Sequence, residues 1–206
     1  MTRIKICGLT RPEDVRYVNT AKPDWCGFIL NFPSSRRNVT PEQARALRAG
    51  LDPDIRPVGV FVDRPVEGVA ALLNSGVISV AQLHGREDNA YISVLRTLAP
   101  GCVVWRAFQL RSQADLAAAD ASGADLVLLD NGRGTGQTFD WSLAGSVHRP
   151  FLLAGGLTPE SIPRAVAALR PYGLDLSSGV ETDGVKDREK IWKAVQIAHK
   201  YAAIHD

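Results

Sequence analysis

The 206-residue chain is poor in cysteine and histidine. It has three cysteines, an odd number, and no Cys-x-x-Cys motif, so the sequence indicates neither a disulfide framework nor a cysteine-based zinc site. This usage is typical of a protein in a reducing, cytosolic setting. The four histidines are scattered and form no His-Glu-x-x-His motif. We therefore expect no metal site.

Long apolar runs and an excess of one charge are also missing. No apolar stretch near the amino terminus has the length of a signal peptide or a transmembrane helix. The formal net charge is +2, and the chain has no polybasic run. Neither nucleic acid nor a membrane surface is therefore an expected partner. We expect a cytoplasmic protein, either a monomer or a homodimer.

Short apolar runs alternate with helix-patterned stretches along the whole chain. Eight runs predict strands, and these lie at residues 3–6, 25–30, 57–62, 77–83, 102–108, 125–129, 150–153 and 173–176. Helices are predicted at residues 12–20, 41–49, 66–74, 87–98, 113–122, 159–169 and 187–201, with a short or irregular piece near 141–147.

Strands that alternate with helices pair in parallel through right-handed crossovers. Eight such units predict an α/β fold, a compact single-domain (β/α)8 or TIM barrel over residues 1–206, with short loops. The alternative is a doubly wound open sheet. The count of eight strands and the lack of a Gly-x-Gly-x-x-Gly motif after the first strand argue against that alternative.

Cys7 stands where the first predicted strand stops. Gly8 permits a tight turn there, and Thr10 followed by Pro12 indicates the start of a helix. The carboxyl ends of parallel strands carry the chemistry of α/β barrels. A thiol at such a place can serve as a base or a nucleophile. The other interpretation of Cys7 is a small buried apolar filler.

Polar side chains stand in three later strands that are otherwise apolar. Asp130 ends the apolar run 126–129, where burial favours a protonated, acid-competent carboxyl; the alternative is a cap of the following loop. Gln82 shares a strand face with Val80, and Asp175 shares one with Ser177, so each either ties the barrel together or contacts substrate. We predict His84 and Asp175 as substrate-binding residues, although no triad-like partner for His84 is visible.

Glycine-bearing loops follow the seventh and eighth predicted strands. Gly155 and Gly156 lie in the first loop, and Ser178 and Gly179 lie in the second. Backbone amides in such loops bind phosphate in many barrels, and tight turns are the alternative. The loop at 31–41 carries Arg36 and Arg37, either of which can hold a carboxylate or a phosphate.

Taken together and in order, these segments resemble the phosphoribosylanthranilate isomerase family. The resemblance runs from residue 3 to about residue 188 and rests on KICG at 5–8, GFI at 27–29, VGVF at 58–61, QLHG at 82–85, LLD at 128–130, GTGQTFDW at 134–141, LAGGL at 153–157 and SSGVE at 177–181. It implies a TIM barrel that catalyses the third step of tryptophan biosynthesis. That step is an Amadori rearrangement of N-(5-phosphoribosyl)anthranilate, which needs no cofactor or metal.

The resemblance also implies roles for individual residues. Cys7 resembles the general base and Asp130 the general acid of the family. Arg37 resembles the arginine that holds the anthranilate carboxylate, although the chain departs from the family pattern at Arg36, a proline in the family, and at Asn38, an aromatic residue in the family. Arg36 therefore stays the alternative. The residues that resemble the family's phosphate loops are Gly155, Gly156, Ser178 and Gly179.

Two other functions compete with this interpretation. The first is the related histidine-pathway isomerase, which rearranges a phosphoribosyl aminoimidazole carboxamide, or a bifunctional form of it. That family has an aspartate as its base and two phosphates to hold, whereas this chain has Cys7 and clear phosphate-type loops only after the last two strands. The second is a barrel that binds a sugar phosphate without turning it over, against which the pair of Cys7 and Asp130 argues.

Overall fold

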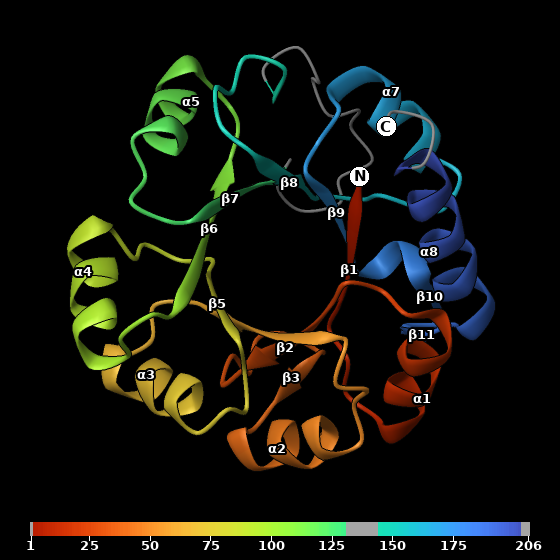
Figure 1. Cartoon of the computed structure of the whole chain (residues 1–206), viewed down its shortest axis with the longest axis horizontal. Coiled ribbons are helices and arrows are strands. Elements are labelled where there is room, and N and C mark those ends of the chain that lie inside the picture. Colours follow the sequence, from red (N-terminus) through yellow and green to blue (C-terminus); the bar gives the residue numbers. More distant parts are fainter. Residues whose placement is uncertain (1, 131–143, 203–206) are drawn as a thin grey trace.

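The computed structural model describes residues 2–130 and 144–202. Eight parallel strands form a closed barrel, because each pairs with its neighbour and β1 also pairs with β2 (Figure 1). The order around the ring is β1, β9, β8, β7, β6, β5, β4, β2. The strands are β1 (Arg3–Cys7), β2 (Trp25–Leu30), β4 (Arg56–Phe61), β5 (Val80–Leu83), β6 (Val103–Gln109), β7 (Leu126–Asp130), β8 (Phe151–Leu153) and β9 (Gly173–Leu176). The barrel expected from the sequence is confirmed.

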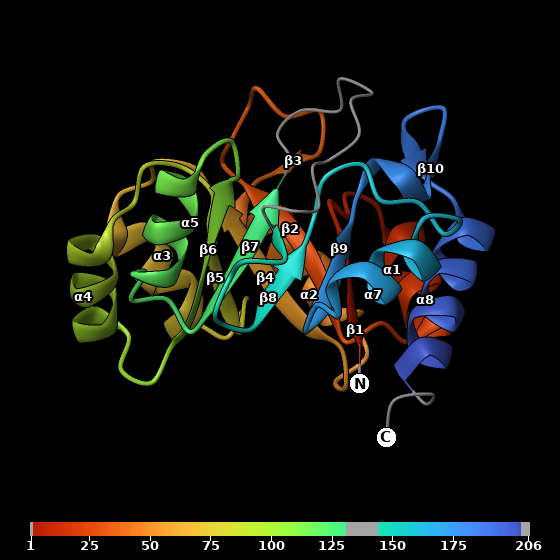
Figure 2. The same cartoon turned by 90° about the horizontal axis from the view of Figure 1, so that it is seen from above.

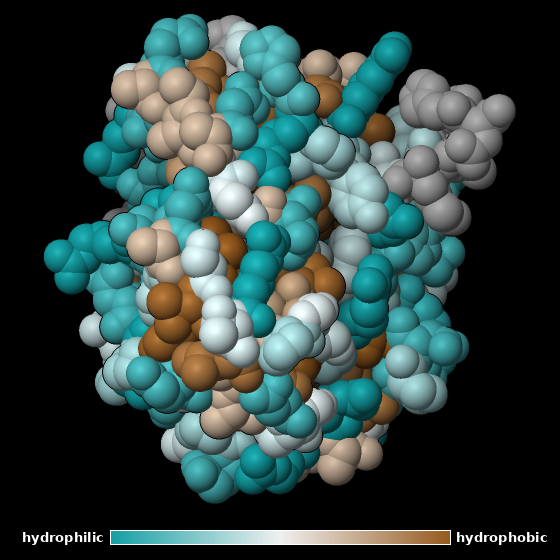
Figure 3. Space-filling view, turned by 60° about the vertical axis from the view of Figure 1, so that its left-hand side comes forward, coloured by the Kyte–Doolittle hydropathy of each residue, from teal (hydrophilic) through white to brown (hydrophobic). Residues whose placement is uncertain are grey.

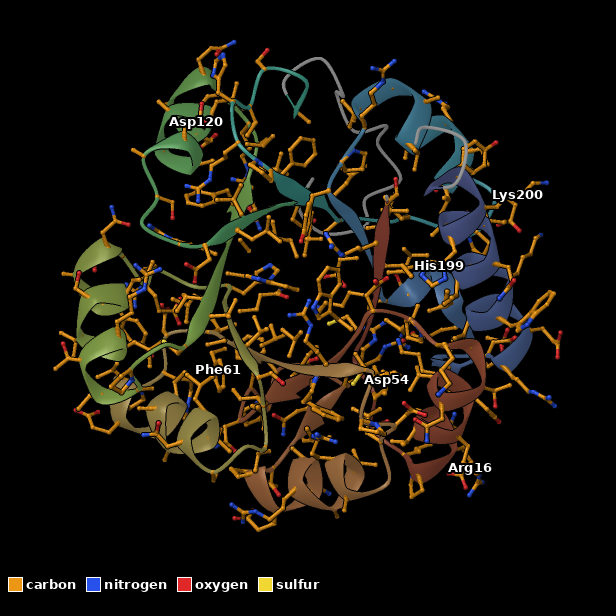
Figure 4. All side chains as sticks on the ribbon, in the orientation of Figure 1. Arg16, Asp54, Phe61, Asp120, His199 and Lys200 are labelled. Atoms are coloured by element: carbon orange, nitrogen blue, oxygen red, sulfur yellow. The ribbon has the colours of Figure 1, made fainter. Side chains whose placement is uncertain are left out.

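Helices surround the barrel on its outside (Figure 1). Side chains fill the ring that the strands enclose, so the barrel is packed (Figure 4). The outer surface is mixed in polarity: Figure 3 shows hydrophobic residues in patches among hydrophilic ones. The helices are α1 (Pro12–Ala21), α2 (Pro41–Ala49), α3 (Val66–Asn74), α4 (Asn89–Leu98), α5 (Gln113–Asp120), α7 (Ile162–Leu169) and α8 (Arg188–Ala202).

The alternation of side chains along each strand divides the buried residues into two cores. The inner core lies inside the ring of strands and contains Trp25, Val58, Val80, Trp105, Leu126, Leu128, Leu152 and Ala154. The outer core lies between strands and helices and includes Ile4 and Ile6 of β1. Because successive strand side chains point to opposite faces, Lys5 and Cys7 of the same strand face the barrel interior.

Three short strands and one 3-10 helix are added to the barrel. They are β3 (Asn38–Val39), which pairs with β2, the hairpin of β10 (Glu181–Thr182) and β11 (Val185–Lys186), and the 3-10 helix η1 (Ser178–Val180). In Figure 2, β3 and β10 lie at one end of the barrel and the amino terminus lies at the other. These additions therefore extend the end at which the strands finish.

Two predicted elements start three residues later in the structure than in the sequence analysis. The predicted strand at 77–83 begins at Val80, because the amides of Val77 and Ile78 donate to the Leu72 carbonyl at the end of α3. The helix predicted from residue 159 begins at Ile162, because Ser161 and Thr158 hydrogen-bond each other in a preceding turn. The GTGQTFDW segment at 134–141 and the start of the short piece expected near 141–147 lie outside the described residues.

Candidate active site

A cavity of about 290 Å3 opens at the end of the barrel where the strands finish. All nine residues to which the sequence analysis gives a catalytic, substrate-binding or phosphate-binding role as its first choice line this cavity. They come from six places in the chain, and they are Cys7, Arg37, His84, Asp130, Gly155, Gly156, Asp175, Ser178 and Gly179. Apolar side chains, including Ile29 and Val60, complete the wall. The fold thus brings residues up to 172 positions apart (179 − 7) to one place.

Cys7 lies at the end of β1 beside a buried lysine. Its residue surface is 6% exposed, and that of Lys5 is fully buried. The Lys5 ammonium donates to both carboxylate oxygens of Asp175, at 3.0 and 3.1 Å. Gly27 on the adjacent strand makes room for this group, because a Cβ there would lie 2.8 Å from the Cys7 sulfur and 3.0 Å from Cε of Lys5. Asp175 therefore ties the barrel interior together and also lines the cavity.

The buried charges around Cys7 oppose one another. Burial raises the pKa of the Cys7 thiol above its ordinary value, and the Lys5 ammonium offsets only part of this effect. Burial also disfavours the Lys5 ammonium, but Asp175 and Cys7 outweigh burial, so the pKa of Lys5 is raised. The thiol therefore keeps its proton at neutral pH. Its position at the end of a strand does not bring its pKa down to neutral.

Asp130 is the last residue of β7, and its side chain is 21% exposed. His84, which follows β5, places Nε2 3.5 Å from the Asp130 carboxylate. Gln82 places its amide nitrogen 3.4 Å from Nδ1 of His84. Since an amide nitrogen only donates, this contact favours the imidazole tautomer whose proton faces Asp130. Among the described residues, the buried Gln82 carbonyl oxygen has no hydrogen-bond partner.

The two adjacent arginines of the loop after β2 differ in position. Arg37 lines the cavity and its side chain is 19% exposed, whereas the Arg36 side chain is 57% exposed and does not line it. Gly8 has a φ of +82°, and a Cβ at this position would overlap Cδ of Arg37. The turn after β1 therefore leaves the space that Arg37 occupies, and the geometry favours Arg37 as the arginine available to a ligand.

The two glycine-bearing loops meet beside the cavity. Gly155 and Gly156 have φ values of +91° and +68°, a conformation that glycine adopts without strain. A Cβ at Gly179 would overlap the carbonyl oxygen of Leu157, so only glycine permits the loops after β8 and β9 to approach this closely. Backbone amides carried on such closely packed turns can surround an anion.

The order of strands fixes the order of groups around the cavity. Going around the ring from β2, the cavity meets Arg37, then Cys7 on β1, then the glycine loops after β9 and β8, then Asp130 on β7. A thiol and a carboxyl thus stand three strands apart with an anion-suited surface between them. This arrangement can hold a small anionic molecule between an acid and a base.

Three residues near the cavity were not among the site residues predicted from the sequence. Lys5 and Gly27 set the surroundings of Cys7, and Glu181 holds Arg37. Lys5 could be found from its alternation with Cys7 on one strand face. Gly27 and Glu181 gave no local signal, because each acts on a residue that is distant in sequence.

Residues 2–130 and 144–202 contain no group of three or more His, Cys, Asp or Glu side chains placed to hold a metal ion. None of the helices described is both long enough and apolar enough to span a bilayer.

Comparisons with known proteins agree on one family. The family model of N-(5'-phosphoribosyl)anthranilate isomerase matches residues 4–197. The isomerase of that name from Acetivibrio thermocellus is 43% identical over 204 residues, which cover 93% of each chain. The one from Endomicrobium trichonymphae is 43% identical over 202 residues, covering 96% of this chain and 98% of the relative.

Solved structures give the same result. A phosphoribosylanthranilate isomerase in complex with reduced 1-(o-carboxyphenylamino)-1-deoxyribulose 5-phosphate is 33% identical, with a TM-score of 0.82, over 97% of this chain and all of that one. The Thermus thermophilus isomerase is 37% identical, with a TM-score of 0.83, over 97% of this chain and 99% of that one. A 3-hexulose-6-phosphate synthase from Salmonella typhimurium, 15% identical with a TM-score of 0.75, shares the fold alone. The chain therefore belongs to the N-(5'-phosphoribosyl)anthranilate isomerase family and is an isomerase.

Proposed function

We propose that this protein converts N-(5-phosphoribosyl)anthranilate into 1-(2-carboxyphenylamino)-1-deoxyribulose 5-phosphate, with Asp130 as the general acid and Cys7 as the general base. The observation that carries the proposal is that both groups line one cavity together with Arg37 and two glycine-bearing loops. Membership of the isomerase family and the named ligand of a relative support the choice of substrate. The reaction is an Amadori rearrangement and requires one proton donor and one proton acceptor.

In the first step, Asp130 donates a proton to the furanose ring oxygen. The bond between that oxygen and C1′ breaks, and the nitrogen lone pair forms an iminium with C1′. The His84 Nε2–H faces the carboxylate that remains, at 3.5 Å, and its dipole favours the negative charge that develops there. The arrangement of Gln82, His84 and Asp130 supports this step, because it supplies a donor to the group that becomes negative.

In the second step, Cys7 removes the proton from C2′ to give an enolamine, which becomes the ketone when C1′ gains a proton and the C2′ hydroxyl loses one. The base has to be the thiolate, whereas burial raises the pKa of the Cys7 thiol. The iminium places a positive charge beside the sulfur, and an opposite charge favours the thiolate. Lys5 acts in the same direction. The base is therefore strengthened at the stage at which it is needed.

Arg37 and the glycine loops hold the two charged ends of the substrate. The Arg37 guanidinium binds the anthranilate carboxylate, and backbone amides around Gly155, Gly156, Ser178 and Gly179 bind the phosphate. His84 and Asp175 contact the sugar. Fixing both ends places the sugar between acid and base and removes the entropy cost of finding that geometry during the reaction.

The assay follows the loss of fluorescence of the anthranilate-bearing substrate. The wild-type protein is expected to remove this fluorescence without added metal or cofactor, and not to turn over the phosphoribosyl aminoimidazole carboxamide of the histidine pathway. Binding of substrate without any loss of fluorescence contradicts catalysis and supports a sugar-phosphate-binding barrel. Equal turnover of both compounds supports the bifunctional form.

The wider setting follows from this reaction. We place the protein in tryptophan biosynthesis in the cytoplasm and treat residues 1–206 as one catalytic domain. Its partner is the small phosphoribosyl substrate. We expect a monomer or a homodimer, and one solved relative is described as monomers generated from the dimeric Thermotoga maritima isomerase.

A further inference from the structure

Glu181 is a buried carboxylate that three cationic side chains surround. It begins β10, and its side chain is 4% exposed. Arg37 donates to it through Nε at 2.6 Å and Nη2 at 2.8 Å, Arg36 through Nη2 at 2.6 Å, and Lys186 through Nζ at 2.7 Å. These contacts outweigh burial, so the pKa of Glu181 is lowered to about 2 and the group is ionised. We call these four residues the Glu181 clamp.

The clamp fixes which edge of Arg37 is available to a ligand. A guanidinium binds a carboxylate best through two parallel N–H groups. In Arg37 one such edge, made of Nε and Nη2, is already occupied by Glu181. Among the described residues no hydrogen-bond partner of Nη1 is found, and the side chain lines the cavity. The Nη1 side is therefore the part that remains for an incoming anion.

The clamp also joins two segments that are distant in sequence. Arg36 and Arg37 lie in the loop after β2, and Glu181 lies 144 residues beyond Arg37. Lys186 donates both to Glu181 and to the carbonyl oxygen of Ser177, at 3.0 Å. At Gly184, the turn of the β10–β11 hairpin, a Cβ would overlap Nη1 of Arg36. The loop and the hairpin are thus packed to fit each other around one carboxylate.

We propose that Glu181 is a positioning residue for substrate carboxylate recognition: it holds the Nε–Nη2 edge of Arg37 and directs the Nη1 side into the cavity. The inference rests on the proposed function of Arg37. An arginine side chain loses considerable rotamer entropy when it is fixed. Glu181 fixes Arg37 before the ligand arrives, so the ligand does not bear that cost.

A simple charge effect makes the opposite prediction. Glu181 carries a negative charge beside a cavity that is expected to bind anions. If only that charge mattered, removing it would leave an uncompensated cation and tighten the binding of every anionic ligand. If positioning matters, removing it weakens the ligands that use Arg37 and spares the others. The sign of the change in affinity therefore distinguishes the two effects.

The experiment compares two probes: reduced 1-(o-carboxyphenylamino)-1-deoxyribulose 5-phosphate and the same molecule without the carboxyl group. Dissociation constants are measured for wild type, Glu181→Gln, Arg37→Ala and the double variant. Glu160→Gln is the matched control, because Glu160 has the same charge but is exposed and pairs with Lys193 at the surface. Glu181→Asp is a second variant that keeps the charge and shortens the reach, and circular dichroism checks folding.

The expected result is that Glu181→Gln weakens the carboxyl-bearing probe about tenfold and changes the other probe less than twofold. In the Arg37→Ala background Glu181→Gln has no further effect, and Glu181→Asp gives an intermediate loss. Glu160→Gln changes neither probe.

Three results overturn the inference. If Glu181→Gln binds both probes more tightly, Glu181 acts only through its negative charge. If it binds both probes equally more weakly, Glu181 only stabilises the fold. If Arg37→Ala fails to discriminate between the probes, the assignment of Arg37 as carboxylate anchor falls and the role of Glu181 falls with it. Turnover by the wild-type protein is measured separately, so the proposed reaction can stand or fail independently of Glu181.

Discussion

The barrel has a cavity of about 290 Å3 at each end, but the two differ in chemistry. At the end where the strands finish, the wall carries a thiol, carboxyls, an imidazole, a guanidinium and glycine loops. At the end where the strands begin, three aromatic side chains dominate, those of Trp25, Trp105 and Tyr172. Trp25 and Trp105 meet edge to face, with ring centroids 5.1 Å apart. Cavity size therefore does not identify the candidate active site, whereas the lining does.

The charged groups at the two ends also differ in how they are used. At the aromatic end, Asp125 accepts from the Val104 amide and from Arg96, and Arg56 lies over the Trp25 ring. These contacts join the ends of neighbouring strands and helices. At the other end, Asp175 binds the Lys5 ammonium beside Cys7, and Glu181 binds the Arg37 guanidinium. The charged groups at the aromatic end join elements of the fold, whereas those at the other end lie around a cavity.

The largest effect is expected for the two proposed catalytic residues. Cys7→Ala and Asp130→Asn are each expected to lower kcat by about 10²- to 10⁴-fold, because each removes a proton-transfer group. Steady-state fluorescence assays measure the effect, and circular dichroism confirms that each variant folds. Turnover within twofold of wild type in either variant refutes the role of that residue.

Acid is expected to weaken the Glu181 clamp. The Glu181 pKa of about 2 lies below the unfolded value of about 4.3, so its ionised form stabilises the fold above that value. Glu181→Gln is expected to lower the free energy of unfolding by about 3 kcal/mol at pH 7. The difference from wild type should shrink as the pH falls from about 4.3 to about 2. Urea titrations at several pH values test this, and a difference independent of pH argues against an ionised Glu181.

Removal of the proposed carboxylate anchor is expected to raise KM. Arg37→Ala is expected to raise KM by about 30-fold, or about 2 kcal/mol, with a smaller change in kcat, because the anchor binds ground and transition states alike. Initial rates over a range of substrate concentrations separate the two constants. An unchanged KM shows that Arg37 is not the anchor.

A substitution at the aromatic end should separate stability from activity. Trp105→Leu is expected to lower the free energy of unfolding by about 2 kcal/mol, because it removes buried aromatic contacts. This loss should be independent of pH, and kcat and KM should stay within twofold of wild type. Urea unfolding and the fluorescence assay give both values for one preparation. A tenfold loss of kcat would show that the two ends are coupled.

The smallest effect is expected for the neighbouring arginine. Arg36→Ala should change KM less than threefold, because its side chain is largely exposed and does not line the cavity. The same rate measurements as for Arg37→Ala apply. If Arg36→Ala raises KM and Arg37→Ala does not, the two residues exchange roles.

Local sequence patterns predicted the barrel well and its boundaries less well. The alternation of apolar runs and helical stretches gave all eight strands, because each run pairs and packs through its own side chains. The start of β5 was wrong by three residues, since Val77 and Ile78 are apolar for a different reason: they are buried in the turn after α3. Hydrophobicity alone does not distinguish a buried turn from a strand.

Side-chain alternation and the parallel order of strands are enough to predict the fold and the set of candidate residues, because they bring every strand end to one side of the barrel. The pairing of the charged side chains is seen only in the folded structure. The structure paired Lys5 with Asp175, 170 residues away, and it turned Arg37 rather than Arg36 into the cavity. It also showed that burial raises the pKa of the Cys7 thiol. Such electrostatic contacts depend on distance and burial between distant segments, and no local pattern records them.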